Sequence, residues 1–367
     1  MFEDYEVPVP GFFIQEELDA RGWSQRDLAF ILGIEETALN KIIKGKTGIS
    51  LEMSKALAEA FEVDNDFFAN LQKAYDLAHS AAPDPAIARR ASLQAKYPVR
   101  EMIKRGWLEN MEIGLLEVQL QRFFKPVLHA AKKTNSGEDA TPTQLAWLHR
   151  VIQIAESMNC KPYSEKAFHA SKATLKKLMT EPEHIRRVPS LLAECGLRFV
   201  IVEGLPNAKI DGVSLWLDSN TPVIGLSLRY DRIDNFWFVF WHECAHILHR
   251  HGHNAPPILD VELEGDRAAD SEINSAQERV ANRDAAEMCI SQHEMISFMA
   301  KRYPFFSERD VVSFAATMHV HPGIIIGQIQ SRTKRWNLLR KYLVKVRQYL
   351  LGSTAVDGWG QVAPVSI

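Results

Sequence analysis

Apolar side chains recur every three or four positions through the first 76 residues, and short polar breaks interrupt the pattern. This spacing is typical of short amphipathic helices. Gly22, Gly33 and Gly45 stand where helices are expected to end, and Ser24 and Ser50 stand where helices are expected to begin. The pattern predicts five helices, over residues 13–22, 25–32, 36–44, 51–61 and 66–75. The second and third of these, joined by a short turn, form a helix-turn-helix pattern.

A Pro- and Ala-rich stretch at residues 78–86 follows and is typical of a linker. Beyond it the helical period returns, and Thr141 with Pro142 marks a helix start. Further helices are expected over residues 97–129, 147–158 and 165–179. The resulting division is a helix-turn-helix domain at 1–76, a helical linker region at 77–145, a third domain at 146–350 and a flexible tail at 351–367.

The pattern changes at Gly196, where β-branched and apolar residues replace the helical period. Three strands are expected, and a turn at 218–220 makes the last two a hairpin. They cover residues 197–202, 212–217 and 222–228. A strongly apolar helix follows, and residues 281–350 are predicted to be helical again, ending in a basic helix at 331–350. The predicted fold class is α+β, mainly helical with one small three-stranded sheet.

The composition is that of an ordinary globular protein, with 46% hydrophobic residues, 24% charged residues and a net charge of −3. No apolar run approaches the roughly 20 residues that a membrane span needs, and the acidic N-terminus lacks the pattern of a signal peptide. The four cysteines are far apart, which argues against a cysteine zinc site and against a disulfide framework. A cytoplasmic protein without a membrane partner is expected.

The strongly apolar helix carries the candidate chemistry, because His242-Glu243-Cys244-Ala245-His246 is an H-E-x-x-H motif. Two histidines four positions apart lie on one face of a helix and can bind one Zn²⁺. Glu243 between them can accept the proton of a metal-activated water and pass it to a leaving amine. The aromatic run at 236–241 buries this helix, which a chance pair of surface histidines would not require.

A catalytic zinc needs a third protein ligand and an open position. The metzincin spacing fails, because His249 stands where that motif requires glycine. The remaining candidates are acidic residues of later segments: Asp270, Glu272, Glu278 and Glu287. Glu278 is favoured over Glu272, since Ala281 and Ala285 share its helix face and would allow a close approach. Three further histidines are expected in a solvated loop and not as ligands: His249, His251 and His253.

Residues 10–72 resemble the XRE/Cro class of helix-turn-helix regulators, and more closely the HigA-type antitoxins. The resemblance lies in Ser24-Gln25, the helix from Glu36, the loop at 45–50 and the Phe67-Phe68-x-x-Leu71 ending. It implies that the helix at 36–43 enters the major groove of double-stranded operator DNA. The implied base and backbone contacts are Gln25, Thr37, Asn40, Lys41, Lys44 and Lys46.

Charge complicates this interpretation. Residues 1–76 hold seven basic residues against fifteen acidic ones. Because attraction to phosphates supplies most non-specific affinity, this domain alone should bind DNA weakly. Docking to a protein such as a toxin is the alternative use of the fold.

The region from Val188 to Gln330 resembles the ImmA/IrrE family of zinc metallopeptidases. The matching stretches are 197–202, 212–227, 236–249, 278–282 and 322–330. The resemblance implies His242, His246 and Glu278 as zinc ligands and Glu243 as the catalytic base. Asp284 departs from the family pattern, which usually has a large apolar residue there, so local packing is expected to differ.

Members of that family cleave a helix-turn-helix repressor and so relieve repression. The resemblance implies a DNA-binding regulator whose zinc endopeptidase cuts a specific protein, which is a partner repressor, a toxin or its own chain. The alternative is a HigA-type antitoxin or repressor whose peptidase-like domain is a sensor or docking module without proteolytic activity. A homodimer is expected, because helix-turn-helix regulators usually pair to read two half-sites.

Overall fold

The computed structural model describes residues 7–124, 132–133, 139–253, 257–261, 276–351 and 356–364. The chain forms two compact units, Met1–Pro85 (unit 1) and Ala86–Ile367 (unit 2). This division lies beyond the boundary predicted at residue 76. The reason is that the fifth helix continues to His79, and residues 80–84 without helix or strand separate it from the next helix.

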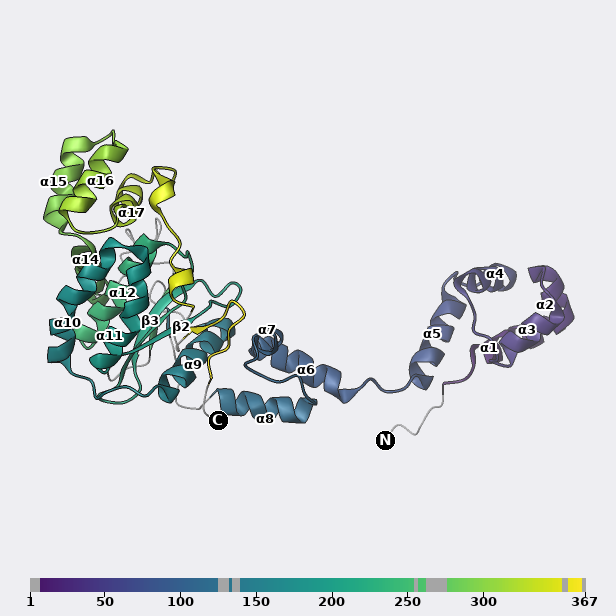
Figure 1. The fold of residues 1–367 in the computed structure, drawn as a ribbon. Coiled ribbons are helices and arrows are strands. Elements are labelled where there is room, and N and C mark those ends of the chain that lie inside the picture. The colour runs from purple at the N-terminus through teal and green to yellow at the C-terminus, as the bar shows by residue number, and fades with distance from the viewer. Residues whose placement is uncertain are drawn as a thin grey trace. The chain divides into compact units, whose positions relative to one another are not determined.

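The described part of unit 1 consists of helices (Figure 1). They are α1 (Pro10–Arg21), α2 (Gln25–Leu32), α3 (Glu36–Ile43), α4 (Leu51–Phe61) and α5 (Phe67–His79). Ser24 caps α2 in a reciprocal capping box with Asp27, and Ser50 caps α4. Gly22 ends α1 in the left-handed conformation that only glycine adopts without strain. These local signals confirm the predicted helices to within a few residues, although α5 extends further.

The helices of unit 1 surround one apolar core. Its members recur at helical spacing: Ile14, Leu18, Leu28, Leu39, Leu57, Phe61 and Phe68. Trp23, which precedes α2, stacks on Phe61 with ring centroids 6.2 Å apart. The core therefore fixes the α2–α3 pair against α1 and α4, with which these helices are in contact.

Unit 2 opens with helices that precede the main strands. They are α6 (Pro85–Lys96), α7 (Val99–Lys104), α8 (Ile113–Phe123), α9 (Pro142–Ser157), α10 (Glu165–Lys177) and α11 (Val188–Glu194). Thr141 caps α9 and forms a capping box with Gln144, as the Thr-Pro pair predicts. No helix in the described part of the chain is long and apolar enough to span a membrane.

The sheet of unit 2 is mixed and has the strand order β1-β5-β3-β4-β2-β6. Its strands are β1 (Lys132–Lys133), β2 (Arg198–Val202), β3 (Ile210–Trp216), β4 (Pro222–Leu226), β5 (Ile258–Val261) and β6 (Val356–Asp357). β3 and β4 form the predicted antiparallel hairpin. β5 pairs with the other edge of β3 in antiparallel register, which sets Asp260 opposite Gly212. The predicted three-stranded sheet is thus the centre of a larger one, whose added strands are too short for a sequence pattern.

Both faces of this sheet are buried, because side chains alternate along each strand. On β2, Phe199 and Ile201 join the core formed with α10, α11 and α12 (Ile233–Leu248), whereas Val200 and Val202 join the core formed with α7, α8 and α9. Figure 1 shows α12 and α9 flanking the strands. The sheet is therefore the platform against which the helix with the H-E-x-x-H motif packs.

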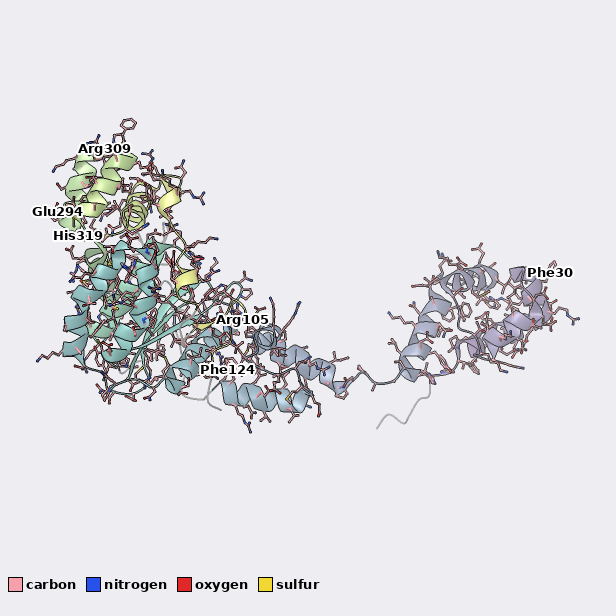
Figure 2. The ribbon with its side chains drawn as sticks, in the orientation of Figure 1. Phe30, Arg105, Phe124, Glu294, Arg309 and His319 are labelled. Carbon is pink, nitrogen blue, oxygen red and sulfur yellow. The ribbon has the colours of Figure 1, made fainter. Side chains whose placement is uncertain are left out.

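The region predicted as a helical linker packs against the sheet beyond residue 98. Met102 of α7 and Leu116 of α8 belong to the same core as β2. Arg105, labelled in Figure 2, donates hydrogen bonds to the carbonyl oxygens of Glu203 (2.8 Å) and Gly204 (3.0 Å) just after β2. The sequence pattern indicated that these segments are helical but not that they belong to the core of unit 2.

The helices after the metal motif end earlier than predicted. They are α14 (Ala276–Cys289), α15 (Gln292–Arg302), α16 (Glu308–Thr317) and α17 (Pro322–Thr333). The predicted basic helix at 331–350 is wrong, because Lys334 adopts a left-handed conformation and short 3₁₀ turns follow. This segment turns back onto the start of α12, where Ile233 N–H donates to the carbonyl oxygen of Val344 (3.0 Å).

The prediction of a flexible tail is also wrong for residues 356–364. Val356 and Asp357 form β6, which pairs in parallel with β2. Asp357 is buried and accepts hydrogen bonds from Arg150 Nε (2.7 Å) and from Trp107 Nε1 (2.9 Å). These partners lie more than 200 positions away along the chain, so no local pattern could indicate the contact.

Candidate metal centre and helix-turn-helix surface

The metal motif lies on α12, whose side chains are buried along almost the whole helix. Phe236, Trp237, Phe240 and Trp241 occupy the core between this helix and its neighbours. His242 and His246 follow with four-residue spacing, so both rings extend from one face of the helix. Their Nε2 atoms are 3.0 Å apart. The buried helix therefore holds two imidazole nitrogens at one point, as the sequence predicts.

Glu278 of α14 completes the set that the sequence analysis favoured. Its Oε2 lies 3.4 Å from His242 Nε2, and its Oε1 lies 3.4 Å from His246 Nε2. Ala281 and Ala285 on the same helix are fully buried and allow α14 to pack closely on α12. Of the other candidates, Asp270 and Glu272 lie outside the described residues. Glu287 is exposed, and its carboxylate accepts a hydrogen bond from the Gln292 N–H instead.

A fourth acidic side chain, which the sequence analysis missed, joins these residues. Asp260 of β5 places Oδ2 3.3 Å from His242 Nε2. The potential ligand atoms of His242, His246, Asp260 and Glu278 all lie within 4.8 Å of one another. The signal was present in the sequence Leu259-Asp260-Val261, since alternation in a strand turns the acid away from its two apolar neighbours. Leu259 and Val261 lie in the core with α9, and Asp260 faces the other way.

Glu243 occupies a space that β3 leaves open for it. A Cβ atom at Gly212 would overlap Glu243 Oε1, so the carboxylate needs glycine at this strand position. Glu243 itself is 0% exposed. Gly212 also pairs with Asp260, so one glycine accommodates both carboxylates that face the cluster.

The charges of the cluster perturb one another strongly. Burial alone would lower the pKa of His242, but the carboxylates of Asp260 and Glu278 outweigh it and raise this pKa to about 10. Burial, together with the charge of Asp260, raises the pKa of Glu243 well above its ordinary value. Burial opposes ionisation of Asp260 as well, but His242 lowers the pKa of Asp260. Three buried carboxyl groups thus compete for positive charge at one point.

A divalent cation fits this donor set. Two imidazole nitrogens and carboxylate oxygens are the ligands that zinc takes in catalytic sites. Its charge would offset the repulsion that raises the pKa of Glu243. The cluster of His242, His246, Asp260 and Glu278 could therefore hold a metal ion, with zinc as one of the ions that its chemistry suits.

The histidine-rich segment after α12 supports the cluster from outside. His251 Nδ1 lies 3.0 Å from His246 Nδ1. Burial, with His246 and His249, lowers the pKa of His251 to about 4, so its ring stays neutral and can accept the His246 Nδ1 proton. This would leave His246 Nε2 free for a metal. His249 Nε2 lies 2.7 Å from Asp284 Oδ2, so the acid that departs from the family pattern has a local partner.

In unit 1, the side chains predicted to contact DNA lie on and after α3. Thr37, Lys41, Lys44 and Lys46 are exposed. Gln25 at the start of α2 and Asn40 are half-buried, and Asn40 Nδ2 donates to Gln25 Oε1 over 3.0 Å. Phe30 of α2 is 87% exposed at the outer surface of the unit (Figure 2). The two predicted base readers thus bond to each other across the helix-turn-helix, and the predicted cations surround the end of α3.

Comparison with known proteins identifies unit 1. Residues 14–68 match the family model described as helix-turn-helix. A stretch of 71 residues, 19% of this chain, is 41% identical to virulence-associated protein A′ of Dichelobacter nodosus over the helix-turn-helix region. The chain spans 62% of the length of that relative. The N-terminal unit is therefore an XRE-type helix-turn-helix, which confirms that part of the prediction and supports a DNA-binding regulator.

Proposed function

We propose that unit 2 is a zinc-dependent endopeptidase and that the whole chain is a regulator whose peptidase cuts a specific regulatory protein. The observation that carries the proposal is the convergence of His242, His246 and Glu278 beside Glu243 in one buried site. Two histidines and a glutamate, with a second glutamate next to them, are the components of a hydrolytic zinc site.

In this proposal His242, His246 and Glu278 would hold the ion. Bound zinc supplies Lewis acidity toward a water molecule and a scissile carbonyl group. Glu243 takes the proton of the attacking water and delivers it to the leaving amine. Burial and the charge of Asp260 raise the pKa of Glu243, so its carboxylate holds a transferred proton readily. His251 keeps the ring of His246 oriented through their Nδ1–Nδ1 contact.

The substrate class follows from the unit to which the peptidase is fused. The helix-turn-helix supports a role at DNA, so we propose a protein that acts with it in regulation: a partner repressor, a toxin or the chain itself. In unit 1, Thr37, Asn40 and Gln25 would contact bases, while Lys41, Lys44 and Lys46 would contact bases or phosphates. A homodimer would present two such units to paired half-sites.

The test compares wild type with Glu243→Gln, which keeps every residue of the metal cluster. Each full-length protein is loaded with zinc and incubated alone and with the product of the adjacent gene, and intact-mass spectrometry follows the fragments. We expect the variant to bind zinc like wild type and to cleave at least about 100-fold more slowly, because a general base is lost.

Glu287→Gln on α14 is the matched control. The same chemical change there lies at an exposed position bonded to Gln292, and cleavage should stay at the wild-type rate. If Glu243→Gln cleaves as fast as wild type, the proposed mechanism is wrong.

A second candidate function is a repressor whose metal site is a sensor or docking module without proteolytic activity. The complete burial of Glu243 favours it, since a catalytic base must reach substrate. Stoichiometric zinc, with no cleavage of the chain or of the neighbouring gene's product, would favour this alternative over the peptidase.

A further inference from the structure

We propose that Asp260 is a fourth ligand of the metal, that it takes the position a substrate water needs, and that it closes the site into a resting state. The inference rests on the proposed function, because it concerns the regulation of the same site. Zinc sites with four protein ligands are closed, whereas catalytic sites keep one position open. A closed site would also account for the burial of Glu243.

The position of Asp260 separates a ligand from a supporting residue. A carboxylate that only orients a metal-binding histidine bonds to the ring nitrogen that faces away from the metal. Asp260 Oδ2 instead lies 3.3 Å from His242 Nε2, the same nitrogen that faces His246 and Glu278. Asp260 therefore lies on the ligand side of the imidazole.

The distances also fit a shared ion better than hydrogen bonds. His242 Nε2 has three neighbours, at 3.0, 3.3 and 3.4 Å, yet a ring nitrogen carries at most one hydrogen. Ligands of a tetrahedral zinc with bonds of 2.0–2.1 Å are about 3.3 Å apart. The separations among the four side chains match that value, so one central ion satisfies contacts that one proton cannot.

The strand that carries Asp260 is suited to reversible release. β5 has four residues, and its pairing with β3 is irregular between Ile210 and Gly212. Irregular pairing of this kind redirects side chains beside functional sites. Gly212, opposite Asp260, has no side chain to block movement of the carboxylate. Withdrawal of Asp260 would open one metal position and leave the two histidines and Glu278 in place.

Access of an external anion to the metal tests the inference without measuring cleavage. The full-length chain is loaded with Co²⁺, whose visible spectrum reports its ligands, and titrated with azide. We expect azide to leave the wild-type spectrum unchanged, because Asp260 fills the fourth position. Asp260→Asn should bind azide with a saturable spectral shift and should hold Co²⁺ at least about 10-fold more weakly.

Asp218→Asn is the control, since Asp218 is exposed at the β3–β4 turn and should behave like wild type. An azide shift in wild type equal to that of Asp260→Asn would overturn the inference, and so would unchanged Co²⁺ affinity in the variant. The wild-type titration decides even if the variant misfolds. Loss of the proposed peptidase would show separately, as equal cleavage by wild type and Glu243→Gln with these spectra unaltered.

Discussion

The two units place their functional side chains in opposite environments. In unit 1 the predicted DNA contacts Thr37, Lys41, Lys44 and Lys46 are exposed on and after α3. In unit 2 His242, Glu243, Asp260 and Glu278 are buried between α12, α14 and the sheet. An exposed set can be changed without disturbing a core, whereas buried charges must be compensated wherever they lie. Function and stability should therefore separate in unit 1 and depend on each other in unit 2.

The largest expected effect concerns the buried polar contacts on which unit 2 depends. Asp357→Ala removes the carboxylate that Arg150 and Trp107 contact and leaves the Arg150 guanidinium buried without its counter-charge. We expect a loss of about 3–5 kcal/mol in the free energy of unfolding of unit 2, measured by urea titration of the full chain.

Gln361→Ala is the control for that measurement, because Gln361 is exposed in the same C-terminal segment. Its effect should stay within about 0.5 kcal/mol. A loss of less than about 1 kcal/mol for Asp357→Ala would mean that the C-terminal segment is not part of the stable core.

The smallest expected effect on stability lies in unit 1. Lys44→Ala combined with Lys46→Ala should leave unfolding within about 0.5 kcal/mol of wild type. The same variant should weaken binding to all duplex sequences alike and reduce the slope of log affinity against log salt by about 2. Fluorescence anisotropy with one duplex at several salt concentrations measures this slope.

Lys73→Ala on α5 is the control for that experiment, because it removes a charge from an exposed site away from α3. A double variant with an unchanged salt slope would favour protein docking, and not DNA binding, as the use of this surface.

The same contrast explains what the sequence could predict. Unit 1 is specified by local signals: the capping box of Ser24 and Asp27, the cap at Ser50 and the left-handed Gly22 all act within a few residues. Such signals are readable from one chain. The α12 motif and Glu278 were readable too, because helical spacing alone aligns His242 with His246.

The features that escaped prediction depend on distant partners. Asp260 reaches the cluster only because β5 pairs with β3, and a four-residue strand with an acid in it gives little signal. Asp357 is ordered by Arg150, 207 positions away in the chain. Lys334 ends α17, and the chain then turns back to pair with the start of α12. In each case tertiary contacts override a local pattern that was weak or pointed elsewhere.

The central claim is that the buried cluster of unit 2 binds a divalent metal, and zinc content measures it most directly. Full-length wild type, Glu243→Gln and His242→Ala are dialysed against zinc and analysed for metal per chain. We predict one zinc in wild type and in Glu243→Gln and none in His242→Ala. Zinc at about 1,000 times its Kd should stabilise unit 2 by about 4 kcal/mol. A wild-type chain without zinc, or equal zinc in His242→Ala, would contradict the account.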